Sequence, residues 1–151
     1  MATLFRATEA GLVRALRTVG AGRVALATAY ADDVNTRLIG FLEAEGFDIA
    51  AVKGLAMTDV VGVGDVTPDT LTALAQEVFA QAGTAQAVLI SCGGLKTLGI
   101  LERLEAHLGV PVISSSPAGF WDVVQLAKID PPMDSDNYFV DMGRMYRPRA
   151  R

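Results

Sequence analysis

The sequence has very few of the residues from which disulfides and metal sites are built. Its 151 residues include one cysteine, Cys92, and one histidine, His107. A single cysteine excludes an intrachain disulfide, and with only one histidine beside it a structural zinc site is not expected. We therefore expect no metal in this protein.

Long apolar runs and an excess of positive charge are missing as well. No stretch approaches the roughly 20 apolar residues that span a bilayer, and the arginine-bearing N-terminal segment is amphipathic, unlike the apolar core of a signal peptide. With 13 basic and 17 acidic residues, the net charge is -4. Nucleic acid and anionic membranes do not attract an acidic surface, so we expect neither as a partner. These absences predict a soluble, cytoplasmic protein.

Apolar residues, in contrast, are abundant. They make up 51% of the chain, and the mean hydropathy is +0.35. This composition suits a parallel sheet that is covered on both faces. It also favours a further surface that is buried against a partner, and we expect a homo-oligomer.

The pattern along the chain predicts an α/β fold, in which strands alternate with helices. The predicted strands are residues 23–30, 48–57, 85–91 and 110–115, and the predicted helices are residues 7–19, 32–46, 68–82, 95–109 and 118–129. Short connections between them indicate right-handed crossovers and a parallel sheet. We expect a single doubly wound, flavodoxin-like domain with a four-stranded parallel sheet over residues 1–129. An extended C-terminal tail, residues 130–151, follows it.

The predicted fold indicates where a ligand would bind. In open parallel sheets, ligands bind beyond the carboxyl ends of the strands. The residues at those ends include Tyr30, Cys92, Gly93, Gly94 and the serines 114–116. The sequence contains no Walker motif, dinucleotide fingerprint or carboxylate pair at these positions. We therefore expect a site of hydroxyls, one thiol and glycine amides.

Cys92 has two interpretations on local grounds. Cysteine is often buried as a small apolar residue. At a strand end just before the helix predicted for residues 95–109, however, it would face the positive end of that helix, which favours a thiolate. Gly93 and Gly94 carry no side chain that would keep a ligand from their amides. The local sequence leaves both interpretations open.

The neighbouring hydroxyl residues also allow more than one interpretation. Tyr30 is either a ligand contact or an aromatic residue at the rim with its hydroxyl in water. Ser114 to Ser116 are better suited to capping the last helix than to chemistry, and Ser116 is the best cap candidate.

Two segments resemble a known family. "RVALATAYADDVNTRLIGFLEAEGF" and "VLISCGGLKTLGILERLEAHLGVPVISSSPAGFWDVVQLA" are similar to the second half of the arylmalonate decarboxylases, in the aspartate/glutamate racemase superfamily. Maleate cis-trans isomerases resemble the region too, but tend to have Thr-Asn after the cysteine and Asn-Gln in the serine stretch. Gly93-Gly94 and Ser116-Pro117 favour the decarboxylase branch.

The resemblance implies a cofactor-independent decarboxylation of a small carboxylate substrate. One carboxylate of a disubstituted malonate leaves as carbon dioxide, and the other becomes an enediolate held by hydrogen-bond donors. By position, Cys92 matches the proton donor, while Tyr30 and the amide of Gly93 match part of the donor set, with Gly94 beside them. Fixed donors of this kind are usually the largest catalytic contribution.

The family fold has two similar domains with the site between them, and this sequence corresponds to one. It is either a natural single-domain relative or a shortened form of a longer chain. The resemblance implies a site completed by another chain, and a homodimer would place two Cys92 thiols across its axis. The alternatives are a maleate isomerase or an amino-acid or hydantoin racemase, and a catalytically incomplete domain that only binds small carboxylates or a partner.

Overall fold

Four parallel strands form the centre of the computed structural model, which describes residues 2–128. The strands lie in the order β2-β1-β3-β4, as the alternating pattern predicts for a flavodoxin-like domain. Their bounds are β1 (Arg23–Tyr30), β2 (Asp48–Met57), β3 (Ala87–Ser91) and β4 (Val112–Ser114). The prediction of an α/β fold with a four-stranded parallel sheet is confirmed.

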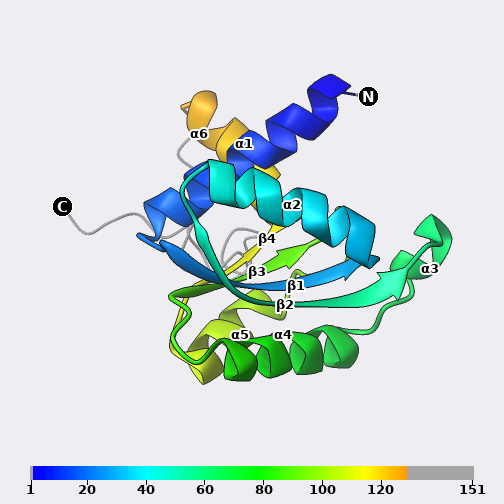
Figure 1. The fold of residues 1–151 in the computed structure, drawn as a ribbon. Coiled ribbons are helices and arrows are strands. Elements are labelled where there is room, and N and C mark those ends of the chain that lie inside the picture. The colour runs from blue at the N-terminus through cyan, green and yellow to red at the C-terminus, as the bar shows by residue number, and fades with distance from the viewer. Residues whose placement is uncertain (1, 129–151) are drawn as a thin grey trace.

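Helices cover both faces of this sheet (Figure 1). One face carries α1 (Ala2–Thr18), α2 (Asp32–Ala44) and α6 (Ser115–Leu126). The other carries α4 (Pro68–Ala82) and α5 (Leu101–Leu108). A single short turn of helix, α3 (Val60–Val63), follows β2. No helix within residues 2–128 has the length and apolar character to cross a membrane.

The two apolar cores follow from the alternation of side chains along each strand. In β1, Val24 and Leu26 pack toward α1, α2 and α6, whereas Ala25 and Ala27 pack toward α4 and α5. Successive side chains of a strand point to opposite faces, so a strand covered on both sides is apolar throughout. This is why β1 is apolar without a break from Val24 to Ala27.

Local signals set the ends of α4. The Thr67 side chain accepts a hydrogen bond from the amide of Thr70 at 3.2 Å, and Pro68 opens the helix. Proline suits this first position because its missing N–H would have no partner inside the helix. Gly83 follows the helix at φ +64°. The predicted helix at residues 68–82 is confirmed.

Three other helices begin at residues different from those predicted. The helix predicted for residues 7–19 is α1, which begins at Ala2 and ends at Thr18. The helix predicted for residues 95–109 is α5, which begins only at Leu101, because Gly99 takes a left-handed φ of +79° that ends any helix continuing from residue 95. The helix predicted to begin at residue 118 is α6, which begins at Ser115 and shortens β4 to three residues. Pro117 lies in its first turn, where amides have no partner within the helix.

The sequence analysis missed one helix, and one predicted segment lies outside the residues that the structure describes. Residues 58–65, predicted as a loop, contain α3, whose first amides donate to the Asp59 side chain. A helix of four residues is too short to show an apolar period. The predicted tail, residues 130–151, and residue 129 before it lie outside the described part of the chain.

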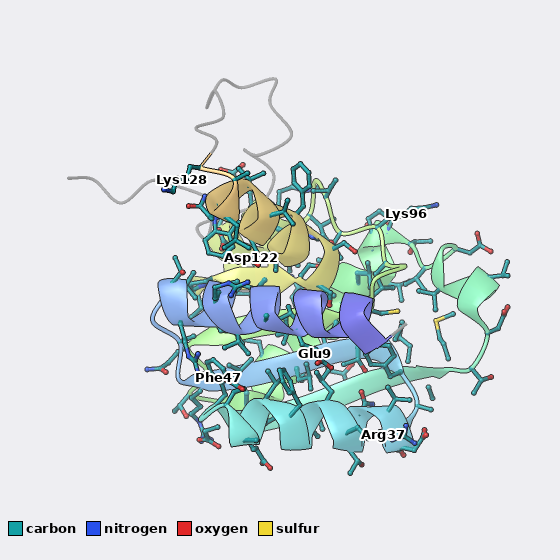
Figure 2. All side chains as sticks on the ribbon, turned by 90° about the horizontal axis from the view of Figure 1, so that it is seen from above. Glu9, Arg37, Phe47, Lys96, Asp122 and Lys128 are labelled. Atoms are coloured by element: carbon teal, nitrogen blue, oxygen red, sulfur yellow. The ribbon has the colours of Figure 1, made fainter. Side chains whose placement is uncertain are left out.

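The N- and C-terminal helices of the described chain lie side by side on one face. Figure 2 shows α6 along α1, and Asp122 on α6 pairs with Arg14 on α1. The helices approach closely at Gly11, where a Cβ atom would lie 3.2 Å from the Cα of Gly119. Glycine at this crossing therefore fixes how near α6 lies to α1.

Candidate active site

The candidate site lies where the order of the strands reverses. From β1 the chain moves outward to β2 and then crosses to β3 on the other side of β1. Ligands of such folds bind beyond the carboxyl ends of the strands at this switch point. Thr28 of β1 pairs with Ser91 of β3, so Tyr30 and Cys92 follow at neighbouring strand ends. The structure brings these two predicted site residues together.

A closed set of hydrogen bonds holds Tyr30. The Thr28 hydroxyl donates to Asn35 Oδ1 at 2.6 Å and accepts the amide of Tyr30 at 3.2 Å. The side-chain amide of Asn35, in turn, donates to the carbonyl of Tyr30 at 3.2 Å. Thr28 and Asn35 are buried, so these bonds form away from competing water.

Asn35 is a residue that the sequence analysis missed. It shares the inward face of α2 with Leu38 and Leu42, at helical spacing of three and seven residues. A polar side chain at an inward position needs hydrogen-bond partners, because burial without them is costly. That spacing was the available signal.

Gly54 of β2 makes this arrangement possible. A Cβ atom there would lie 2.6 Å from Asn35 Nδ2 and nearer still to the carbonyl oxygen of Tyr30. Only glycine leaves room for the Tyr30 backbone and the Asn35 side chain at once. Strand β2 thus contributes to the position of Tyr30, because Gly54 has no side chain there.

The Tyr30 hydroxyl lies against the residues at the end of β3. Burial raises the pKa of the phenol above its usual 10.0, the hydrogen-bond interaction with Ser91 lowers it, and the interactions with Cys92 raise it again. The net direction is upward, so the hydroxyl keeps its proton across the neutral range. A protonated phenol can donate a hydrogen bond to an anion.

The segment that follows β3 exposes backbone donors. Cys92 is a free, half-buried cysteine, and its carbonyl accepts the amide of Leu95 at 3.2 Å in a tight turn. Gly93 and Gly94 are exposed, and their amides make no hydrogen bond with any residue in the range 2–128. A Cβ atom on Gly94 would lie 3.0 Å from Cγ1 of Val63, which places α3 beside this turn.

The three serines do not act as predicted. Ser114 is the N-cap of α6 without a side-chain cap bond, and Ser116 lies inside the helix, so the prediction of Ser116 as the cap is wrong. The Ser116 hydroxyl donates instead to the carbonyl of Gly93 at 2.9 Å. The helix that begins beside the cysteine turn is therefore α6, and not the one that follows Cys92 in sequence.

The site is an open edge of the sheet. A separate groove of about 510 Å³ lies between α1 and α6 and is lined by residues that include Arg14, Trp121 and Gln125. It contains none of the residues at the strand ends. Within residues 2–128, no three His, Cys, Asp or Glu side chains are grouped so that they could hold a metal ion. The donors at the edge are thus a thiol, hydroxyls and backbone amides.

Comparison with known proteins decides the family. Residues 4–140 match the model of the arylmalonate decarboxylase family. The chain belongs to this family. It is 47% identical to the arylmalonate decarboxylase of Bordetella bronchiseptica over 116 residues, which are 77% of this chain and 48% of that protein. It is 32% identical to the maleate isomerase of Nocardia farcinica over 123 residues, 81% of this chain and 48% of that protein.

A solved member of the arylmalonate decarboxylase family shares the fold. The crystal structure of an arylmalonate decarboxylase superposes with a TM-score of 0.82 at 41% identity, and the match covers 92% of this chain and 59% of that one. The resemblance stated from the sequence motifs is confirmed. The chain spans about half the length of the curated relatives that it matches.

Proposed function

We propose that this chain carries the proton-donor half of a cofactor-independent decarboxylase site for substituted malonates. One observation carries the proposal. Cys92, the protonated hydroxyl of Tyr30, and the Gly93 and Gly94 amides, which have no partner in the described part of the chain, meet at the switch point of the sheet. The 47% identity to an arylmalonate decarboxylase supports this assignment over other uses of the fold.

The reaction follows from these groups. The bond from the central carbon to one carboxylate breaks, carbon dioxide leaves, and the electron pair remains on the other carboxyl group as an enediolate. The Gly93 and Gly94 amides and the Tyr30 hydroxyl donate hydrogen bonds to the enediolate oxygens. The Cys92 thiol then gives its proton to the carbon, and the thiolate takes a proton from water.

The arrangement of donors suits this chemistry. Donors that are fixed before the reaction stabilise charge as it develops, without reorganising at that moment. The closed set of bonds around Thr28 and Asn35 fixes Tyr30 in this way. A Cys92 thiol at the end of a different strand approaches the same space from another direction, which allows protonation from one side.

We further propose that a second copy of the chain completes the site. The exposed edge leaves the ligand open to water on one side, and the chain corresponds to half of its relatives. Exposed apolar side chains repeat along α6, where Val123 is 61% and Leu126 is 68% exposed. Large exposed apolar side chains that recur along a helix favour association.

Phenylmalonate decarboxylation over a range of protein concentrations tests both parts. We expect specific activity to rise with the dimer fraction measured by light scattering, and Cys92→Ala to lower the rate by about 10² to 10⁴. A monomer at all concentrations contradicts the shared site. Equal rates for the wild type and Cys92→Ala contradict the role of the thiol.

A maleate isomerase is the second candidate, because the Nocardia farcinica isomerase is 32% identical. Conversion of maleate to fumarate, with phenylmalonate left unchanged, would favour it. Racemisation of aspartate or a hydantoin would favour the racemase alternative. Protection of Cys92 from alkylation by phenylacetate without turnover of any substrate would identify a domain that only binds carboxylates.

A further inference from the structure

Two consecutive serines at the start of α6 each contact a different part of the candidate site. The buried Ser115 donates through its hydroxyl to Ser91 Oγ at 3.1 Å. The exposed Ser116 donates to the carbonyl oxygen of Gly93 at 2.9 Å. Neither serine caps its own helix, so both hydroxyls serve residues at the end of β3.

The bond from Ser116 orients a peptide unit. The carbonyl of Gly93 and the amide of Gly94 belong to one trans peptide, in which C=O and N–H point in opposite directions. Because Ser116 holds this carbonyl on the side of α6, the Gly94 N–H is turned to the other side. Glycine on both sides of the peptide allows it to rotate, so a bond that fixes it has a large effect on where the N–H points.

The bond from Ser115 continues toward Tyr30. Ser91 accepts the hydrogen bond from Ser115, and its own hydroxyl lies close enough to the phenol of Tyr30 to lower the pKa of that phenol. A hydroxyl that donates toward the phenol oxygen favours donation of the phenol hydrogen to an acceptor on the other side, such as a bound carboxylate. Hydroxyls in such a chain polarise one another and strengthen the last donor.

The helix that carries both serines is itself firmly placed. Arg14 of α1 pairs with the buried carboxylate of Asp122, two turns after Ser115. The close approach of Gly11 to Gly119 sets the distance between the two helices. These two contacts fix the position of α6 against α1.

We propose that Ser115 and Ser116 are positioning residues for a carboxylate bound at this edge. Ser116 aims the Gly94 N–H at the carboxylate, and Ser115 sets Ser91 so that the Tyr30 hydroxyl donates to the same group. The inference rests on the proposed function, since it names what holds that function's donors in place.

The test uses two reagents that alkylate the single cysteine of the full chain. Iodoacetate carries a carboxylate and iodoacetamide does not, while both transfer their carbon to sulfur with loss of iodide. The preference for iodoacetate is the ratio of the iodoacetate rate to the iodoacetamide rate. We expect this ratio to be higher for wild-type Cys92 than for the thiol of glutathione. We expect Ser116→Ala to lower the iodoacetate rate about three- to tenfold, as loss of one aligned donor would, and to leave the iodoacetamide rate unchanged.

The controls separate positioning from stability. Ser116→Thr keeps the hydroxyl and should restore the preference for iodoacetate. Thr72→Ala removes an exposed hydroxyl that donates to a backbone carbonyl at 2.8 Å in α4, and should not alter the preference. If Ser116→Ala leaves the preference intact, or slows both reagents equally, its positioning role is wrong. If the wild type has no preference, the proposed anion site itself is wrong.

A second pair of variants tests the Ser115 branch. Ser115→Ala and Tyr30→Phe should each lower the preference for iodoacetate, and the double variant should lower it no further than Tyr30→Phe alone. Ser114→Ala is the matched control. Ser114 accepts a buried hydrogen bond from the Thr97 hydroxyl at 2.8 Å, and neither residue contacts Tyr30 through this bond. Additive effects in the double variant would show that Ser115 does not act through Tyr30.

Discussion

The ends of β1 and β3 lie side by side and are built in opposite ways. At the end of β1, the Tyr30 backbone makes two hydrogen bonds, one with Thr28 and one with Asn35, and these two side chains bond to each other. Gly54 leaves space for this arrangement. At the end of β3, the chain turns through two exposed glycines whose amides have no partner among residues 2–128. One end has its hydrogen bonds satisfied, and the other offers donors.

This difference separates two tasks that a carboxylate site must perform. A side-chain donor is effective only when its backbone is held still, which the buried bonds around Tyr30 provide. A backbone donor is effective only when no side chain covers it, which Gly93 and Gly94 provide. Substitutions at the β1 end should therefore reduce stability, while those at the β3 end should mainly change ligand recognition.

The largest effect is expected at Gly54. Gly54→Ala places a methyl group 2.6 Å from Asn35 Nδ2, so the backbone at Tyr30 must shift, at a cost of about 3 kcal/mol in unfolding free energy. Urea denaturation measures it. Gly40→Ala is the matched control, because nothing lies within 4 Å of its Cβ position in α2, and it should stabilise by about 0.5–1 kcal/mol. If Gly54→Ala leaves the unfolding free energy unchanged, the β1 end is not tightly packed.

Asn35→Ala comes next. It leaves the Tyr30 carbonyl without its donor and the buried Thr28 hydroxyl without its acceptor, and we expect a loss of about 1–3 kcal/mol in unfolding free energy. The neighbouring Thr36→Ala removes an exposed hydroxyl that donates to Asp32, so it should cost far less. Equal losses for the two variants would contradict the role given to Asn35.

Gly94→Ala tests the β3 end. The new methyl group would lie 3.0 Å from Cγ1 of Val63, so we expect a loss of about 1 kcal/mol together with a weaker preference of Cys92 for iodoacetate. Gly93→Ala meets only the Ser116 hydroxyl at 3.8 Å, an ordinary contact, and should leave the stability within about 0.5 kcal/mol. A collapse of stability in Gly93→Ala would mean that this end is as closely packed as the other.

The smallest effect concerns the pH dependence of Tyr30. Because its pKa is raised in the folded protein, the stability gained from the neutral phenol is complete below pH 10 and is lost as the pH rises through the folded pKa. A pH titration followed by absorbance at 295 nm should show one phenol that ionises at a higher pH than free tyrosine. This phenol should be missing in Tyr30→Phe. If the absorbance lost in Tyr30→Phe belongs instead to a phenol that ionises like free tyrosine, the Tyr30 hydroxyl is in water.

Much of this arrangement could be predicted from the sequence. Apolar runs separated by helical patterns indicated a parallel sheet, and the carboxyl ends of parallel strands share one edge. The sequence alone therefore predicts that Tyr30 and Cys92 lie together. The functional roles given to them are proposals that rest on this placement and on the family.

The serines show where prediction by sequence neighbours fails. Cys92 precedes residues 95–109, so that helix was expected to face it, yet α5 begins at Leu101 and the turn contacts α6. Asn35 was missed because its partners, Thr28 and Tyr30, are fixed only once α2 packs on the sheet. Both errors concern which side chains meet between elements. Spacing along α2 indicates that Asn35 points inward, but it does not indicate which residues Asn35 bonds to.

The sequence by itself determined the strands, the edge at which they end and the family, because these depend on local periodicity and on motifs within one segment. Only the tertiary structure decided that α6 supplies the helix start beside Cys92 and that Gly54 makes room for Tyr30. The physical reason is distance along the chain. Ser116 lies 23 residues from Gly93, and their hydrogen bond exists only when the sheet brings β3 and β4 together.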